Sequence, residues 1–262
     1  MNRPSALSAP EKVSPLKRDP ALLPALAAIW ISLAVFVLYP VLRLFLMTFM
    51  VEGQFSFANL GAVLDSWYDR QAFLNSLWLA GAVSVAGTAL GYIYAFAVTR
   101  IPLPSWLKWF LGAVTTLPLI SPPFTSSIAL TLSLGPNGIL LKFFGIENFS
   151  FYGFWGTWMS ETLTYFPVSF LTLAAVLSAI DPNLEDAGLS LGASPGRVFR
   201  TVTLPLSTPG IANSVLLLFA SSLADFATPL VLAGHSFPVL PTQAYLQITG
   251  LYDLRGGAAL SF

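Results

Sequence analysis

Three ionisable residues lie within long apolar stretches of the chain: Arg43, Glu161 and Asp225. A charged side chain at membrane depth costs about 2.5 to 3.5 kcal/mol on insertion scales, so each is a candidate functional group. The two carboxylates offer hard oxygen atoms that suit a cation. We expect Glu161 and Asp225 to face a solute path. Two other interpretations stay open: the charges snorkel to the surface, or an ion pair of Arg43 only holds helices together.

Enzyme chemistry is not indicated by the residues of this chain. A membrane-embedded enzyme needs paired carboxylates, a histidine cluster or an activated nucleophile, whereas the chain has one histidine, His235, and scattered acids. We expect His235 to be solvated in a loop. The sequence contains no cysteine, which excludes disulfides and thiolate metal sites. We therefore predict no catalytic residue and identify no certain metal site.

The polar stretch 181–209 separates two apolar segments and concentrates charge in a chain with only 9% charged residues. Asp181-Pro182 is a strong helix start, because an N-cap side chain precedes a proline at N1. Gly192 and Ser194-Pro195 predict a turn and a second short helix, which we expect to end at Leu204-Pro205. Because the stretch is longer than a return into the membrane requires, it predicts a docking surface for a protein partner.

The composition predicts an all-α integral membrane protein. Hydrophobic residues make up 55% of the 262 residues and the mean hydropathy is +0.74, more than a soluble core of this size can bury. The lipid bilayer is thus one partner. Twelve basic and twelve acidic residues balance, so no basic field exists to attract nucleic acid. Residues 1–20 are rich in proline, serine and basic residues, which predicts a disordered cytoplasmic arm.

A span needs about 20 apolar residues, and the chain contains five such spans and the start of a sixth. The predicted spans are 22–50, 73–98, 106–134, 154–180 and 210–232, with 257–262 beginning another. The odd count predicts that the transmembrane domain, 21–262, is truncated at its C-terminal end. Gly87 and Gly91 are spaced for close helix approach. Pro118, Pro122 and Pro123 predict a kinked third span, with the freed carbonyls satisfied either by a water-lined cavity or by serine and threonine hydroxyls.

The distribution of Lys and Arg predicts which side of the membrane each loop occupies. An inside N-terminus places eight basic residues inside and three outside, with Arg43 left within the first span. The inside set is Arg3, Lys12, Lys17, Arg18, Arg100, Lys108, Arg197 and Arg200; the outside set is Arg70, Lys142 and Arg255. The asymmetry favours a cytoplasmic N-terminus and a cytoplasmic 181–209 loop. Glu161, Asp225 and Arg43 then lie toward the outer side.

The loop resembles the cytoplasmic signature of permease subunits in binding-protein-dependent ABC importers. That signature is Glu-Ala-Ala, three residues, Gly, nine residues, then Ile-x-Leu-Pro. Here the matching residues are Asp186, Ala187, Gly188, Gly192, Leu204 and Pro205 at the full spacing. Asp replaces Glu, Gly replaces the second Ala, and Val replaces Ile. The resemblance extends over most of 73–262 and implies the type I importer permease fold.

The resemblance also implies a mechanism and partners. In this family the loop forms coupling helices that dock on separate ABC ATPase subunits. The sequence contains no phosphate-binding G-x-x-x-x-G-K-[ST] motif, so ATP and Mg²⁺ are expected on the partner and no cofactor on this chain. An extracytoplasmic substrate-binding protein and a second permease half or copy are further expected partners. The implied location is the bacterial inner membrane, with several spans.

The cargo is indicated by residues 225–245, which are similar to the iron(III) branch of these permeases. That branch shares the stretch Asp-Phe-x-x-Pro-Leu-Val-Leu-x-Gly and a following Leu-x-Thr-x-x-Tyr segment. Iron(III) is our first choice, and polyamine, thiamine, phosphonate or sulfate are alternatives. Members of the iron branch resemble two fused permeases, so the chain resembles a first half. An ion-coupled secondary transporter remains the alternative from another class, although it has no need of the signature.

Overall fold

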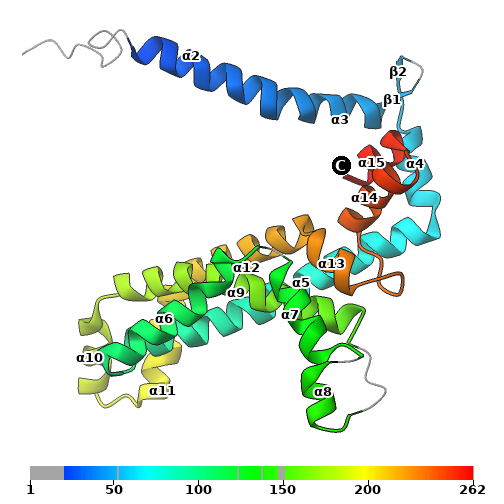
Figure 1. Ribbon diagram of the computed structural model, residues 1–262. Helices are drawn as coiled ribbons and strands as arrows, with labels where there is room; N and C mark the ends of the chain where they lie inside the picture. The colour runs from blue at the N-terminus through cyan, green and yellow to red at the C-terminus, as the bar shows by residue number, and fades with distance from the viewer. Residues whose placement is uncertain (1–20, 52, 123, 137, 147–150, 262) are drawn as a thin grey trace, which may run out of the picture.

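The computed structural model describes residues 21–51, 53–122, 124–136, 138–146 and 151–261. The predicted arm, 1–20, lies outside the described residues. Helices dominate the fold (Figure 1). The first part of the chain contains α2 (Leu22–Leu33), η1 (Ala34–Leu38), α3 (Tyr39–Phe49), β1 (Met50–Val51), β2 (Gln54–Phe55), α4 (Ala58–Asp65), α5 (Trp67–Arg100), α6 (Ser105–Ile120), α7 (Thr125–Leu134) and α8 (Ile139–Phe143). The second part contains α9 (Phe154–Ala179), α10 (Pro182–Ser190), α11 (Pro195–Val198), η2 (Phe199–Thr203), α12 (Leu204–Ala224), α13 (Ala227–Leu232), α14 (Leu240–Gly250) and α15 (Leu254–Ser261).

Four continuous helices in the described part are long and apolar enough to cross a membrane, and a bent pair makes a fifth candidate. The continuous candidates are Leu22–Phe49, Trp67–Arg100, Phe154–Ala179 and Pro195–Ala224. The all-α polytopic fold expected from the composition is therefore confirmed.

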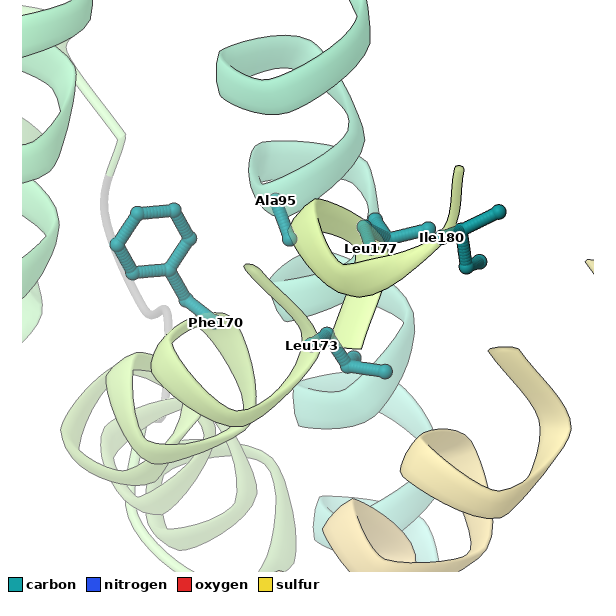
Figure 2. Packing of buried hydrophobic residues seen from close by; sticks show 5 residues of the cluster. All are labelled: Ala95, Phe170, Leu173, Leu177 and Ile180. Atoms are coloured by element: carbon teal, nitrogen blue, oxygen red, sulfur yellow. The ribbon is translucent and has the colours of Figure 1, made fainter. Parts of the chain in front are cut away.

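The centre of the bundle is formed by α5, α9 and α12, which pack closely on one another. Ala95 of α5 meets an apolar group on and just after α9 (Figure 2). That group is Phe170, Leu173, Leu177 and Ile180. Because lipid is as apolar as these side chains, close packing rather than escape from water holds the three helices together.

Gly87 and Gly91 of the second span permit this close approach, as their spacing predicted. A Cβ atom at Gly87 would lie 2.5 Å from Leu218 Cδ2 of α12, and one at Gly91 would lie 2.5 Å from Ser169 Oγ of α9. Neither distance is tolerable for a real side chain, so both neighbouring helices occupy the space that a Cβ needs.

The third span is broken where its prolines predicted. Helix α6 ends at Ile120, α7 begins at Thr125, and the axes of the pair differ by 104°. Near the break, the Thr115 and Thr116 hydroxyls donate to the carbonyls of Leu111 and Gly112. The carbonyls that Pro118 and Pro122 leave free are those of Val114 and Pro118. The two hydroxyl bonds therefore do not decide between hydroxyls and a water-lined cavity, and Pro123 lies outside the described residues.

The fifth span differs from the prediction at both ends. We expected Leu204-Pro205 to end a short helix and the span to cover 210–232. Instead, α11, η2 and α12 form one helical path, Pro195–Ala224, and 227–232 is the separate helix α13. The π-helical segment η2 ends directly before Leu204-Pro205, and Pro205 lies in the first turn of α12. The wider turn of η2 does not use the hydrogen bond to residue i−4 that a proline cannot donate, so the helix continues.

The first span lies apart from the bundle, and every residue from 22 to 46 is exposed. It joins the rest near its C-terminal end, where α3 packs on α15 and α4 (Figure 1). The β1–β2 hairpin follows, with Met50 paired to Phe55 and Val51 to Gln54. Helix α15, which we expected to begin a sixth span at 257, begins at Leu254.

The two ends of the bundle have different structures. Helices α10 and α11 lie at one end, and α4, α14 and α15 lie toward the other (Figure 1). At the second end Asn75 Nδ2 donates to the Pro238 carbonyl at 2.9 Å, and the Leu240 amide donates to Ser76 Oγ at 2.8 Å. These bonds attach the segment before α14 to α5.

Candidate functional site

The loop 181–209 begins with the helix that its first two residues predicted. Asp181 is the N-cap of α10, and its carboxylate accepts a hydrogen bond from the Asn183 amide at 3.0 Å. Pro182 occupies the first turn, where its missing N–H has no cost. The second short helix likewise starts at Pro195, after Ser194.

The turn between α10 and α11 depends on Gly192. Its φ is +86°, in the left-handed region that other residues adopt only at a cost. No atom lies within 4 Å of the position a Cβ would take, so this residue faces open space at the tip of the loop. The glycine of the signature is therefore required by backbone conformation and leaves the tip unobstructed.

Gly188 replaces the second alanine of the signature for a packing reason. A Cβ on Gly188 would lie 3.0 Å from Val198 Cγ2 of α11. Val198 is buried, and it uses the space that glycine leaves between the two short helices. The departure from the signature thus tightens the α10–α11 contact.

The loop presents a mixed polar and apolar surface. Asp186 and Ala187 are exposed on α10. Three leucines near them are also exposed, with Leu191 at 89% and Leu184 and Leu189 at about half. Exposed leucines beside charged residues, at the end of a membrane bundle, are the kind of surface that a protein partner covers.

Leu204 and Pro205 do not belong to this tip. They form the first turn of α12, where Leu204 is partly buried and Pro205 is exposed. The structure therefore brings four of the six signature residues together, Asp186, Ala187, Gly188 and Gly192, and places the last two along the helix that returns into the bundle.

The base of the loop contains an ion pair that the sequence analysis missed. Arg100 Nε, at the end of α5, lies 3.2 Å from Glu185 Oε1 of α10. The Nε–H is not aligned with that oxygen, so the contact is ionic rather than a directed hydrogen bond. Thr203 of η2 donates to the same Oε1 at 2.7 Å, and Arg100 Nη2 donates to the Ile180 carbonyl at 3.2 Å. The two charges are 85 residues apart, and no local pattern pairs them.

Glu161 and Asp225, the predicted path residues, are both buried inside the bundle. Ser222 of α12 donates a short hydrogen bond to Glu161 Oε2, and Asp225 Oδ1 accepts from the amides of Ala227 and Thr228. Among the residues that the structure describes, one oxygen of each carboxylate, Glu161 Oε1 and Asp225 Oδ2, has no hydrogen-bond partner. The two carboxylates lie close enough to interact electrostatically. The two amides that donate to Asp225 belong to the first turn of α13, whose N-cap residue is Phe226.

The remaining candidate residues are Arg43 and His235. Arg43 lines a cavity of about 300 Å³ together with Arg255 and apolar side chains of α3. The ion pair of Arg43 that we considered is not formed within the described ranges. His235 is exposed. The described residues contain no group of three or more His, Asp or Glu side chains placed to hold a metal.

A helical bundle with several membrane-length helices and an exposed two-helix loop defines a multi-pass membrane protein. Residues 87–260 match the family model for the binding-protein-dependent transport system inner membrane component. The chain belongs to this family.

Proteins of similar sequence include permease proteins of ferric and molybdenum transport systems. The chain is 34% identical, over 91% of its length, to the ferric transport system permease protein FbpB of Actinobacillus pleuropneumoniae, of which it covers 35%. It is 34% identical over 91% of its length to the putative ferric transport system permease protein FbpB 1 of Haemophilus influenzae, of which it covers 38%. It is 32% identical over 63% of its length to the Escherichia coli molybdenum transport system permease protein ModB, of which it covers 72%. The chain thus spans little more than a third of its ferric relatives.

A solved structure confirms the fold. A chain of a bacterial alginate ABC transporter, solved in complex with an alginate pentasaccharide-bound periplasmic protein, superposes with a TM-score of 0.80. The superposition covers 94% of this chain and 89% of that chain, at 18% identity. The type I importer permease fold inferred from the loop is confirmed by this match.

Proposed function

We propose that this chain is a transmembrane subunit of an ATP-driven importer and that it couples to a separate ATPase through the loop 181–209. The observation that carries the proposal is the tip of the loop. Gly192 leaves the turn unobstructed, and exposed leucines lie on α10 and next to the turn. The family membership supports the transport role, and ATP and Mg²⁺ belong, in this proposal, to the partner.

The proposed orientation places the loop and the N-terminus in the cytoplasm. The excess of Lys and Arg on that side supports it. At the opposite end, α4, α14 and α15 then meet the substrate-binding protein, and a second permease half or copy completes the path.

The proposed cargo is iron(III). Two ferric transport permeases match the chain over most of its length, which supports this choice. The molybdenum permease matches a smaller share of the chain, so molybdate is the second candidate to test.

The coupling proposal is tested with Gly192→Trp in the complete gene product, purified with its ATPase in nanodiscs. The bulky side chain covers the tip and disfavours the positive φ, so we expect loss of ATPase association. Gly250→Trp is the matched control, because Gly250 also faces open space but ends α14. Equal association of wild type and Gly192→Trp would contradict docking at the tip.

The cargo proposal is tested on the same wild-type complex. ATP hydrolysis is measured with receptor protein loaded with iron(III), loaded with molybdate, or empty. We expect stimulation by the iron-loaded receptor alone. Stimulation by molybdate only would replace the cargo and keep the importer.

Glu161 and Asp225 remain our proposal for path residues. Because both are enclosed in this conformation, contact with cargo requires separation of α9 from α12. Glu161→Gln keeps the size of the side chain and removes the charge. We expect it to lower iron-stimulated hydrolysis at unchanged basal rate; an unchanged stimulation would assign Glu161 to helix packing.

A further inference from the structure

The ion pair at the base of the loop connects four elements through two side chains. Arg100 is the last residue of α5. It contacts Glu185 of α10 and the carbonyl of Ile180, the residue that ends α9. Glu185 in turn accepts the hydroxyl of Thr203 in η2. Both charged side chains are largely shielded from solvent, at 12% and 19% exposure.

Aromatic side chains also pack η2 against α5, near the ion pair. Phe199 of η2 packs edge-on against Tyr92 and Phe96 of α5, with ring centroids 6.2 and 5.5 Å apart. The Tyr92 hydroxyl lies 3.2 Å from Ser207 Oγ of α12. The start of the fifth span is therefore tied to α5 at two levels.

Within the described part of the chain, the tip of the loop has no comparable attachment to the spans. Gly192 and Leu191 project away from the bundle, and α10 is held to α11 through the small contact of Gly188 with Val198. A force applied at the tip reaches the fifth span along the continuous helix Pro195–Ala224, whereas it reaches α5 through the side-chain contacts at the base. Of the charged contacts in the described ranges, the Arg100–Glu185 ion pair is the one that joins α10 to a span.

We propose that Arg100 and Glu185 are positioning residues that transmit movement of the loop into α5 and the end of α9. The proposal rests on the proposed function, since it needs the ATPase to act on the tip. It assigns docking and transmission to different residues: Gly192 and its neighbours contact the ATPase, whereas the ion pair carries the displacement. A shielded ion pair suits this task, because removing one partner leaves the other charge uncompensated and weakens the contact between α5 and α10.

The test uses the complete gene product with its ATPase and receptor in nanodiscs. Glu185→Gln is the main variant, because glutamine keeps the size of the side chain and still accepts the Thr203 hydroxyl. We expect normal ATPase association and basal hydrolysis, with cargo-dependent stimulation lowered about 5-fold or more, the lower bound typical of coupling between sites. Arg100→Gln should have a similar effect, and the double variant should be no worse than either single variant.

Two controls separate transmission from other roles. Lys108→Gln removes a positive charge on α6, predicted for the same side of the membrane, and should leave stimulation unchanged. Arg100→Lys keeps the charge and should retain more stimulation than Arg100→Gln. If Arg100→Gln does not assemble, Glu185→Gln decides the question.

Two results would overturn the proposal. Full stimulation in Glu185→Gln would show that the ion pair transmits nothing. Loss of association in Glu185→Gln would show that the pair shapes the docking surface instead. Failure of the proposed function gives a different result, because the wild type itself would then not associate with the ATPase.

Discussion

Single glycine residues determine two local features of the structure, a close helix contact and a tight turn. Gly91 marks where α9 comes closest to α5, and Gly192 sets the turn of the loop. The two glycines act differently, since one provides space and the other a backbone conformation. Substitution by alanine distinguishes them, because it adds the same methyl group at both positions.

Gly91→Ala should destabilise the bundle by about 1–3 kcal/mol, the usual cost of overpacking. The added methyl group would lie 2.5 Å from Ser169 Oγ and 2.8 Å from the Phe170 amide nitrogen, and backbone cannot move aside cheaply. Thermal unfolding followed by size-exclusion chromatography measures the effect. Gly81→Ala on the same helix is the control, because its Cβ meets no atom within 4 Å. Equal unfolding midpoints would contradict the close approach.

Gly192→Ala should weaken ATPase association without lowering the unfolding midpoint of the bundle. The left-handed conformation costs alanine roughly 1–2 kcal/mol, which the exposed turn relieves by changing shape. The titrated affinity for the ATPase measures the loss. Gly196→Ala is the matched control in the same loop, with open space and no positive φ. A weaker affinity in the control alone would refute the role of the turn.

Helices α5, α9 and α12 pack on one another and leave other faces exposed. Leu177 is fully buried between α9 and α5, whereas Leu216 of α12 faces outward with 68% exposure. Lipid replaces the contacts of an outward leucine but cannot fill an interior cavity. Position, rather than residue type, therefore sets the cost of truncating a leucine here.

Leu177→Ala should destabilise the bundle by about 2 kcal/mol, at the lower end of the range for buried leucines. For a chain of this size that corresponds to a midpoint about 5 °C lower. Leu216→Ala should leave the midpoint nearly unchanged. The two variants are compared by thermal unfolding in the same detergent, and a larger loss for Leu216→Ala would contradict the arrangement of α9 and α12.

The sequence allowed the elements to be predicted where one local signal controls them. Asp181-Pro182 predicted the start of α10, and the prolines after residue 117 predicted the break between α6 and α7. The fifth span was predicted wrongly, because Leu204-Pro205 was expected to end the short helix, and no local pattern shows that the π-helical segment before it lets the helix continue. The contact of Arg100 with Glu185 and the pairing of Glu161 with Ser222 depend on the packing of distant spans. Local patterns cannot reveal them.

The proposed orientation of the whole molecule rests on the distribution of Lys and Arg, and it can be tested directly. The chain has no cysteine, so single cysteines report their own side of the membrane. Leu191→Cys lies at the tip of the loop, and Leu251→Cys lies between α14 and α15, with 71% exposure. In intact spheroplasts, an impermeant thiol reagent should label Leu251→Cys only. Leu191→Cys should react after permeabilisation, and the reverse pattern would invert the topology.

The exposed first span has a consequence for how the protein is made. Apart from segments that follow it directly in the sequence, the first span packs mainly on α15, which begins about 200 residues later in the chain. At about 5–20 residues per second, ribosomes need on the order of 10 to 40 s to reach that helix. During this interval the span lacks its contact with α15, and we expect its own apolar length and flanking charges to govern its place in the bilayer. We therefore expect insertion of this helix to precede assembly of the bundle.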